Sequence, residues 1–158
     1  ERNVYKKLKT WKKSSTRKPL IIKGARQVGK TYIVKRFGES EYDSIAYFNF
    51  EEDPDLNDIF RINLKPQRIL ESLSIYAKFR IQPAKHLIFF DEIQASNDAL
   101  NSLKYFNEQA NEYHINDAVS MLGIRITKPK SYPVVTVNFI NMFTLTFKDL
   151  QDDIGRNE

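Results

Sequence analysis

The sequence predicts an α/β protein in which a mostly parallel sheet of about five strands lies between layers of helices. Short apolar runs alternate along the chain with segments of helical periodicity, which is typical of a parallel sheet wrapped by helices. Residues 87–90 are apolar at every position, as expected for a strand covered on both faces. The length of 158 residues fits one domain, and 41% hydrophobic residues suffice for one core.

Each expected strand is a short apolar run bounded by polar or turn-forming residues. The fourth run departs from this pattern because Asn116 and Asp117 interrupt it. The expected strands are residues 20–22, 45–50, 87–90, 113–119 and 134–140.

Helix boundaries are predicted from capping residues. Gly38 is expected to end the helix that follows the first strand. Asp53 is expected to be an N-cap, with Pro54 at the first helical position. Two later helices are expected to begin at Pro66 and Ser96.

Positive charge is concentrated in residues 1–18, where Val4, Tyr5, Leu8 and Trp11 recur at helical spacing. The formal net charge of the chain is +5, and residues 1–18 carry +7, which leaves −2 for the rest. This distribution favours a solvated, lysine-rich helix packed on the body over a basic nucleic-acid-binding domain. Contact of this helix with phosphates or with an acidic partner stays open.

Composition excludes several classes of protein. Cysteine is absent and histidine occurs twice, which excludes a disulfide scaffold and a cysteine-ligated zinc site and disfavours a histidine-built metal site. No apolar run approaches the roughly 18 residues that cross a bilayer. No membrane partner is therefore expected, and the expected location is the cytoplasm.

Residues 24–31 read GARQVGKT and match the phosphate-binding pattern G-x-x-x-x-G-K-[ST] without deviation. Glycine lets phosphate oxygens approach the main chain, whose N–H groups form an anion-binding nest, and the following helix adds its positive end. Lys30 is expected to reach the β- and γ-phosphates, and the Thr31 hydroxyl to bind Mg²⁺. The residues expected to bind ATP are Gly24, Ala25, Arg26, Gln27, Val28, Gly29, Lys30, Thr31 and Tyr32.

A pair of carboxylates, Asp91 and Glu92, follows the apolar run 87–90 and lies 61 residues after Lys30. Ligands of open α/β sheets bind at the carboxyl ends of the strands, where this pair is expected. Asp91 is placed to hold the Mg²⁺ shell, and Glu92 to align and deprotonate the attacking water.

A second group of acids follows the run 45–50. It is compatible with a second cation site, but a loop and helix start is favoured because acids stabilise the N-terminal end of a helix. Glu51 lies nearest the strand end. The group consists of Glu51, Glu52, Asp53, Asp55 and Asp58.

Seven short stretches carry a family resemblance. On these residues the sequence resembles bacterial and archaeal AAA-superfamily ATPases, in which an N-terminal AAA domain precedes a C-terminal domain of unknown function. The stretches are RKPL (17–20), GARQVGKT (24–31), NFE (49–51), FFDEIQ (89–94), SLKYF (102–106), SMLG (120–123) and SYPV (131–134).

The resemblance implies an additional-strand P-loop fold with strand order 5-1-4-3-2, and ATP and Mg²⁺ as ligands. It implies that Ser120, at the end of the fourth strand, is a polar sensor near the γ-phosphate and joins Glu92 and Lys30 in the catalytic set. The family's C-terminal domain is expected to lie outside this chain, and a homo-oligomer is compatible with the resemblance. The expected division is a basic helix packing on the core (1–18), an AAA-type ATPase domain (19–150) and a polar tail (151–158).

The leading functional hypothesis is a Mg²⁺-dependent ATPase module that couples hydrolysis to movement of another domain. Slow turnover is expected from this chain alone, because no motif identifies a lid arginine or an arginine finger. The alternative is a nucleotide-binding switch that holds ATP or ADP with little turnover. A small-molecule kinase is disfavoured because no acceptor-binding segment or arginine-rich lid is evident. A nucleic-acid role depends on residues 1–18 and on any domain outside this chain.

Overall fold

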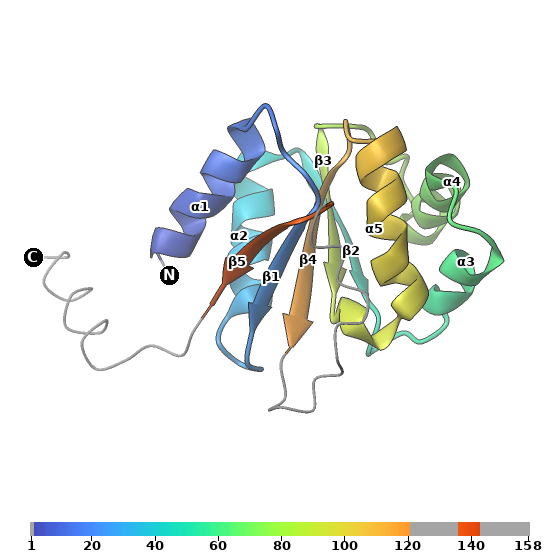
Figure 1. Cartoon of the computed structure of the whole chain (residues 1–158), viewed down its shortest axis with the longest axis horizontal. Coiled ribbons are helices and arrows are strands. Elements are labelled where there is room, and N and C mark those ends of the chain that lie inside the picture. Colours follow the sequence, from blue (N-terminus) through green and yellow to red (C-terminus); the bar gives the residue numbers. More distant parts are fainter. Residues whose placement is uncertain (1, 121–135, 143–158) are drawn as a thin grey trace, which may run out of the picture.

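The computed structural model describes residues 2–120 and 136–142. Its centre is a five-stranded parallel sheet in the order β2-β3-β4-β1-β5, which confirms the expected strand order (Figure 1). Val134 and Val135, which the sequence places in the fifth strand, lie outside the described residues. The strands are β1 (Leu20–Gly24), β2 (Ser44–Asn49), β3 (His86–Asp91), β4 (His114–Ser120) and β5 (Asn138–Asn141).

Helices cover both faces of the sheet and give three layers (Figure 1). One face carries α1 (Arg2–Lys13) and α2 (Lys30–Glu41). The other carries α3 (Leu56–Ile62), α4 (Pro66–Ala77) and α5 (Asn97–Gln109), and a short 3₁₀ turn, η1 (Ile93–Ala95), follows β3. No helix within residues 2–120 and 136–142 has both the length and the apolar character that a membrane crossing needs.

The core consists of two hydrophobic clusters, one on each face of the sheet. Successive strand residues alternate between them, so that Phe89 packs with the α1 and α2 side and Phe90 with the α3, α4 and α5 side. Both phenylalanines are fully buried. This two-sided burial explains why the third strand is apolar at every position.

Two of the predicted helix boundaries are wrong. Gly38 lies inside α2, which continues to Glu41, and a Cβ at Gly38 would lie 2.5 Å from Cγ1 of Ile45. Glycine at this position therefore lets the helix pack closely on β2 rather than ending it. The third helix begins at Leu56 after Asp55, two residues later than Pro54 predicts.

The other two predicted helix starts are confirmed. Pro66 is the first residue of α4. Ser96 caps α5, because its hydroxyl accepts a hydrogen bond from the backbone N–H of Ala99 at 3.1 Å.

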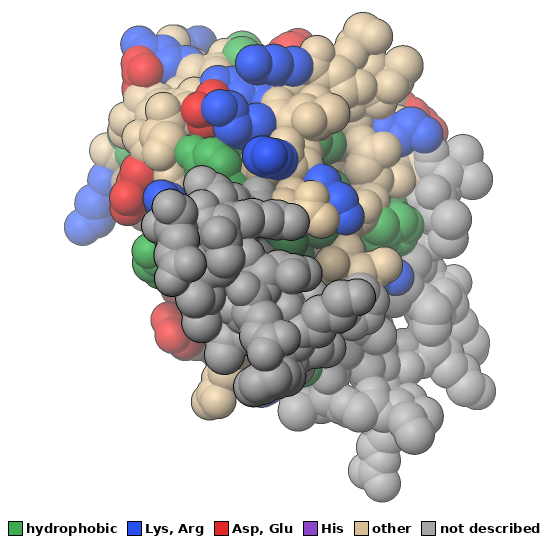
Figure 2. Space-filling view, turned by 90° about the vertical axis from the view of Figure 1, so that its left-hand side faces the viewer, with side chains coloured by type: hydrophobic (Ala, Val, Ile, Leu, Met, Phe, Trp, Pro, Cys, Tyr) green, Lys and Arg blue, Asp and Glu red, His purple; other side chains and the backbone are tan. Residues whose placement is uncertain are grey.

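Helix α1 is attached to the body by the apolar residues at its predicted spacing. Val4, Leu8 and Trp11 are buried, and the ring of Tyr5 packs edge-on against Phe37 of α2. The indole N–H of Trp11 also donates to the carbonyl oxygen of Lys18 at 2.7 Å. Lys and Arg side chains are prominent on the side of the molecule that this helix occupies (Figure 2).

Strand β4 forms although Asn116 and Asp117 lie in its middle, both completely buried. Within the described part of the chain, the side-chain polar atoms of these two residues have no hydrogen-bond partners. Asp117 is aligned with Ile21 and Phe90, and all three point into the cluster beneath α3, α4 and α5. Burial raises the pKa of Asp117 well above its usual value.

Candidate nucleotide-binding site

The site begins at the loop between β1 and α2, at the carboxyl ends of the strands (Figure 1). The loop turns sharply because Gln27 and Gly29 both have positive φ angles, 65° and 90°. Glycine adopts such a φ without cost, and the space where a Cβ of Gly29 would lie contains no atom within 4 Å. The first N–H groups of a helix have no acceptor within the helix, so the start of α2 after Gly29 can bind an anion.

Lys30, the first residue of α2, is 5% exposed and is folded back onto its own loop. Its Nζ donates to the carbonyl oxygens of Gly24 at 2.9 Å and Ala25 at 2.6 Å. Burial lowers the pKa of Lys30, an effect that the nearby Glu92 and Asp91 oppose. A cation held by two carbonyl oxygens beside an open anion nest is available to a phosphate.

The structure shows a second reason why residue 24 is glycine, besides the phosphate access that the sequence suggests. A Cβ at this position would lie 2.5 Å from the carbonyl oxygen of Met142, the residue that follows β5. Glycine is therefore required here by the close passage of another backbone segment, and not only by phosphate access.

Thr31 and Asp91, the two residues that the sequence analysis expects at the Mg²⁺ ion, are in contact beside the loop. The Thr31 hydroxyl donates to Oδ2 of Asp91 at 2.7 Å, and Asp91 is 1% exposed. A hydroxyl and a buried carboxylate are hard oxygen ligands, which Mg²⁺ prefers. These residues therefore fit a magnesium ion.

Glu92 lies one residue beyond β3 and has a left-handed backbone, with φ 54°. Its Oε1 accepts the Ser120 hydroxyl at 2.6 Å, and its Oε2 accepts Nε2 of Gln94, also at 2.6 Å. Ser120 and Glu92 are thus brought together from the ends of β4 and β3. A non-glycine residue at positive φ is typical of a functional position, where packing maintains local strain.

Arg26 and Glu51 form an ion pair at the edge of the site. Both guanidinium NH groups of Arg26 donate to the Glu51 carboxylate, at 2.9 and 2.5 Å. The pairing raises the pKa of Arg26 and lowers that of Glu51. Of the other acids near Glu51, Asp55 is the N-cap of α3 and Asp58 lies in its first turn. Among the described residues no group of three or more histidine, cysteine or acidic side chains is arranged to hold a metal.

The remaining loop residues occupy different environments. Val28 packs against the hydrophobic cluster under α1 and α2. Tyr32, in the first turn of α2, is 59% exposed.

Three residues near Asp91 and Glu92 were not among the residues predicted for the site. Tyr47 and Asn49 lie on β2, and Asn49 is aligned with Asp91 of β3. The signal for them was two polar groups alternating with Phe48 where an apolar strand ends. The signal for Gln94 was its position two residues after Glu92.

The sheet order and this loop are those of the AAA-type P-loop fold. The sequence matches the AAA domain family over residues 16–151, and the chain belongs to that family. None of the curated proteins matches this sequence.

Solved structures share this fold at low sequence identity. The Orc1 protein of Aeropyrum pernix in complex with DNA has a TM-score of 0.57 and 13% identity over 98% of this chain. The Drosophila origin recognition complex bound to DNA has a TM-score of 0.59 and 16% identity over 96% of this chain. The RuvB Holliday junction branch migration motor of Thermotoga maritima has a TM-score of 0.54 and 17% identity over 99% of this chain. This chain spans 47%, 45% and 49%, respectively, of those chains.

Proposed function

We propose that the chain is a Mg²⁺-dependent module that binds and hydrolyses ATP. One observation supports this proposal above all. Lys30 and Thr31 at the start of α2 lie beside Asp91 at the end of β3: the Thr31 hydroxyl donates to the Asp91 carboxylate, and the charges of Asp91 and of the next residue, Glu92, act on the Lys30 cation. Phosphoryl transfer needs these groups: an anion cradle, a cation site and a group that positions water.

Lys30 has the first role in binding. Its Nζ exchanges the carbonyl oxygens of Gly24 and Ala25 for phosphate oxygens, which are stronger acceptors because they carry charge. Thr31 and Asp91 would hold Mg²⁺, which supplies charge neutralisation at the phosphates when bound. The loop N–H groups hold the remaining phosphate oxygens.

Glu92 has the role of general base. Its two carboxylate oxygens are held by Ser120 and Gln94, so the side chain has a defined orientation before any substrate arrives. A positioned base contributes typically 10²- to 10⁴-fold to rate. Turnover of this chain alone is proposed to be slow, since no sequence motif marks an arginine for the γ-phosphate and such a residue contributes about 10³- to 10⁵-fold.

The proposed hydrolysis is tested by Glu92→Gln, which keeps the shape and removes the base. We expect Mg-ATP affinity to stay within about twofold, while steady-state phosphate release falls by roughly 10²-fold or more. Glu108→Gln, an exposed change on α5, is the control and should release phosphate at the wild-type rate. A Glu92→Gln protein with wild-type turnover would show that another group positions the water.

The alternative is a nucleotide switch with little turnover. The full engagement of Glu92 favours it, because a carboxylate with both oxygens bonded has less freedom to accept a proton. In that case the wild-type protein would bind Mg-ATP, but its rate of phosphate release would be no higher than that of Glu92→Gln.

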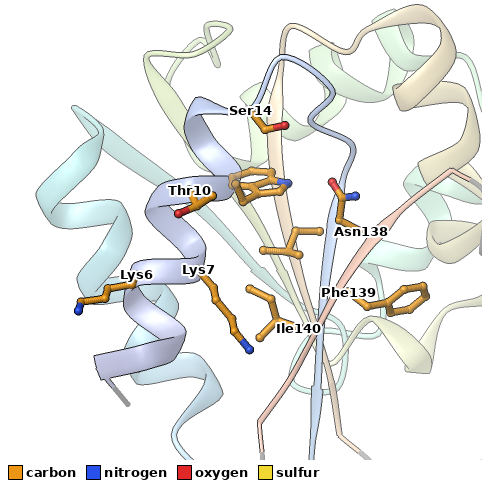
Figure 3. Close-up of a pocket in the computed structure, with 9 residues that line it drawn as sticks. Lys6, Lys7, Thr10, Ser14, Asn138, Phe139 and Ile140 are labelled. Carbon is orange, nitrogen blue, oxygen red and sulfur yellow. The ribbon is translucent and has the colours of Figure 1, made fainter.

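A second candidate function, nucleic-acid binding, depends on α1. Lys6, Lys7 and Lys13 are exposed on this helix, and Lys7 extends toward β5 beside a cavity of about 390 Å³ that Ser14 and Asn138 also line (Figure 3). These groups are donors that bind phosphate oxygens. We expect the triple Lys→Gln variant of the three lysines to bind a short DNA duplex at least tenfold more weakly than wild type at 50 mM salt. Equal binding would refute this role.

A further inference from the structure

The Asp91 carboxylate is held by a hydroxyl from the neighbouring strand as well as by the loop. Oη of Tyr47, on β2, donates to Oδ2 of Asp91 at 2.7 Å, the same oxygen that accepts the Thr31 hydroxyl at 2.7 Å. The other oxygen, Oδ1, accepts the backbone N–H of Glu92 at 3.0 Å. Among the described residues, the donors to this carboxylate are therefore two side-chain hydroxyls and one backbone N–H.

Asn49 fixes the Tyr47 hydroxyl in turn. Its Nδ2 donates to Tyr47 Oη at 3.1 Å, so the hydroxyl accepts one hydrogen bond and directs its own proton to Asp91. Oδ1 of Asn49 accepts the backbone N–H groups of Glu51 at 2.9 Å and Glu52 at 3.0 Å. The amide is thus anchored at both ends and cannot rotate without losing hydrogen bonds.

The aromatic ring of Tyr47 has two further contacts. It packs edge-on against Phe89 of β3 with ring centroids 5.3 Å apart, and Nζ of Lys35 lies 4.0 Å from its centroid. These contacts set the ring plane and deliver the hydroxyl to Asp91.

We propose that Tyr47, supported by Asn49, is a positioning residue for the cation site of this chain. Its hydroxyl fixes the orientation of the Asp91 carboxylate and withdraws charge from Oδ2, as outer hydrogen bonds do for metal ligands. This role rests on the proposed Mg-nucleotide function. A tyrosine that only stabilised β2 would change stability without changing the response to Mg²⁺.

The test is Tyr47→Phe, which keeps the ring and removes the hydroxyl. ADP binding is measured by calorimetry in EDTA and across a Mg²⁺ series. We expect the ADP affinity in EDTA to stay within about twofold of wild type. The Mg²⁺ concentration that gives half of the maximal increase in ADP affinity should rise about tenfold. This is the lower end of the effect of losing a hydrogen bond to a metal ligand.

Tyr42→Phe is the matched control. It removes another tyrosine hydroxyl with a 2.7 Å hydrogen bond, to Nδ1 of His114 at the amino end of β4. The Mg²⁺ dependence of ADP binding by Tyr42→Phe should equal that of wild type. This should hold even if its midpoint of thermal unfolding falls as far as that of Tyr47→Phe.

The outcomes separate the two claims. If wild type binds ADP in a Mg-dependent way and Tyr47→Phe has the same half-maximal Mg²⁺ concentration, the role of Tyr47 is overturned. The proposed function then still stands. Equal shifts in Tyr47→Phe and Tyr42→Phe also overturn that role, because they reflect general destabilisation. A wild-type protein with no Mg-dependent nucleotide binding refutes the proposed function and this role together.

Discussion

The hydroxyl of Ser120 donates to Oε1 of Glu92 over 2.6 Å, although 28 residues separate them in the sequence. This contact ties the end of β4 to the residue that follows β3. The proposed base is therefore oriented by a neighbouring strand as well as by its own backbone.

Replacing Ser120 with Ala should lower turnover while leaving Mg-ATP affinity within about threefold. A hydrogen bond to a charged group contributes roughly 1.5 to 3 kcal/mol, so phosphate release should fall about tenfold or more. Ser102→Ala is the control, since it removes a buried hydroxyl that bonds the Ala99 carbonyl within α5. Wild-type turnover in Ser120→Ala would remove Ser120 from the catalytic set.

Asp117→Val should stabilise the protein by about 1 to 3 kcal/mol, the usual cost of an unsatisfied buried polar group. Valine has a similar volume, suits a strand, and would lie among apolar residues such as Ile21 and Phe90. Urea unfolding measures the change. Asp117→Asn, which keeps an unpaired polar group, should not show the gain, and a Val variant less stable than wild type would contradict the burial argument.

Asp117 should also make stability fall as pH rises. Its folded pKa lies above its usual value, so above about pH 4 the folded protein retains a proton that the unfolded chain releases. Wild type should therefore lose stability, relative to Asp117→Asn, between pH 5 and pH 8. Parallel curves for the two proteins would refute this linkage.

His114 should act in the opposite direction. Burial, with the charges of Arg17 and Lys12, lowers the pKa of His114 to about 4, and Tyr42 Oη lies 2.7 Å from its Nδ1. Below about pH 6.5 the unfolded chain binds a proton that the folded protein does not, so stability is full above that pH and falls toward pH 4.

His114→Asn, whose amide can replace Nδ1, should reduce this acid sensitivity. The loss of unfolding free energy between pH 7 and pH 5 should be smaller in the variant by about 1 to 2 kcal/mol. Equal losses would show that His114 is not the titrating group.

Local sequence patterns suffice for the loop and the strand ends on which the predicted site residues lie. The GARQVGKT loop, the strand before it and Asp91 after a buried run each depend on neighbours in the sequence, and the structure places Thr31 and Asp91 in hydrogen-bond contact. The resemblance supplied the strand order, which the structure confirms.

What the sequence did not predict depends on contacts between distant segments. Tyr47 and Asp91 are 44 residues apart in the sequence. They meet only because β2 pairs with β3 in this register. Glycine is common at helix ends, so the sequence predicts one at Gly38, whereas the close approach of Ile45 is the reason for glycine there. Glu51, which pairs with Arg26, lies in a loop whose orientation no local sequence pattern predicts.

Calorimetric titration of Mg-ATP into wild type and Lys30→Ala tests the central claim most directly. The account predicts saturable binding by wild type and at least tenfold weaker binding by the variant, about 1.4 kcal/mol, because the cation facing the phosphates is gone. Lys104→Ala, an exposed change on α5, should bind like wild type. Equal affinity of wild type and Lys30→Ala would contradict nucleotide binding at this loop.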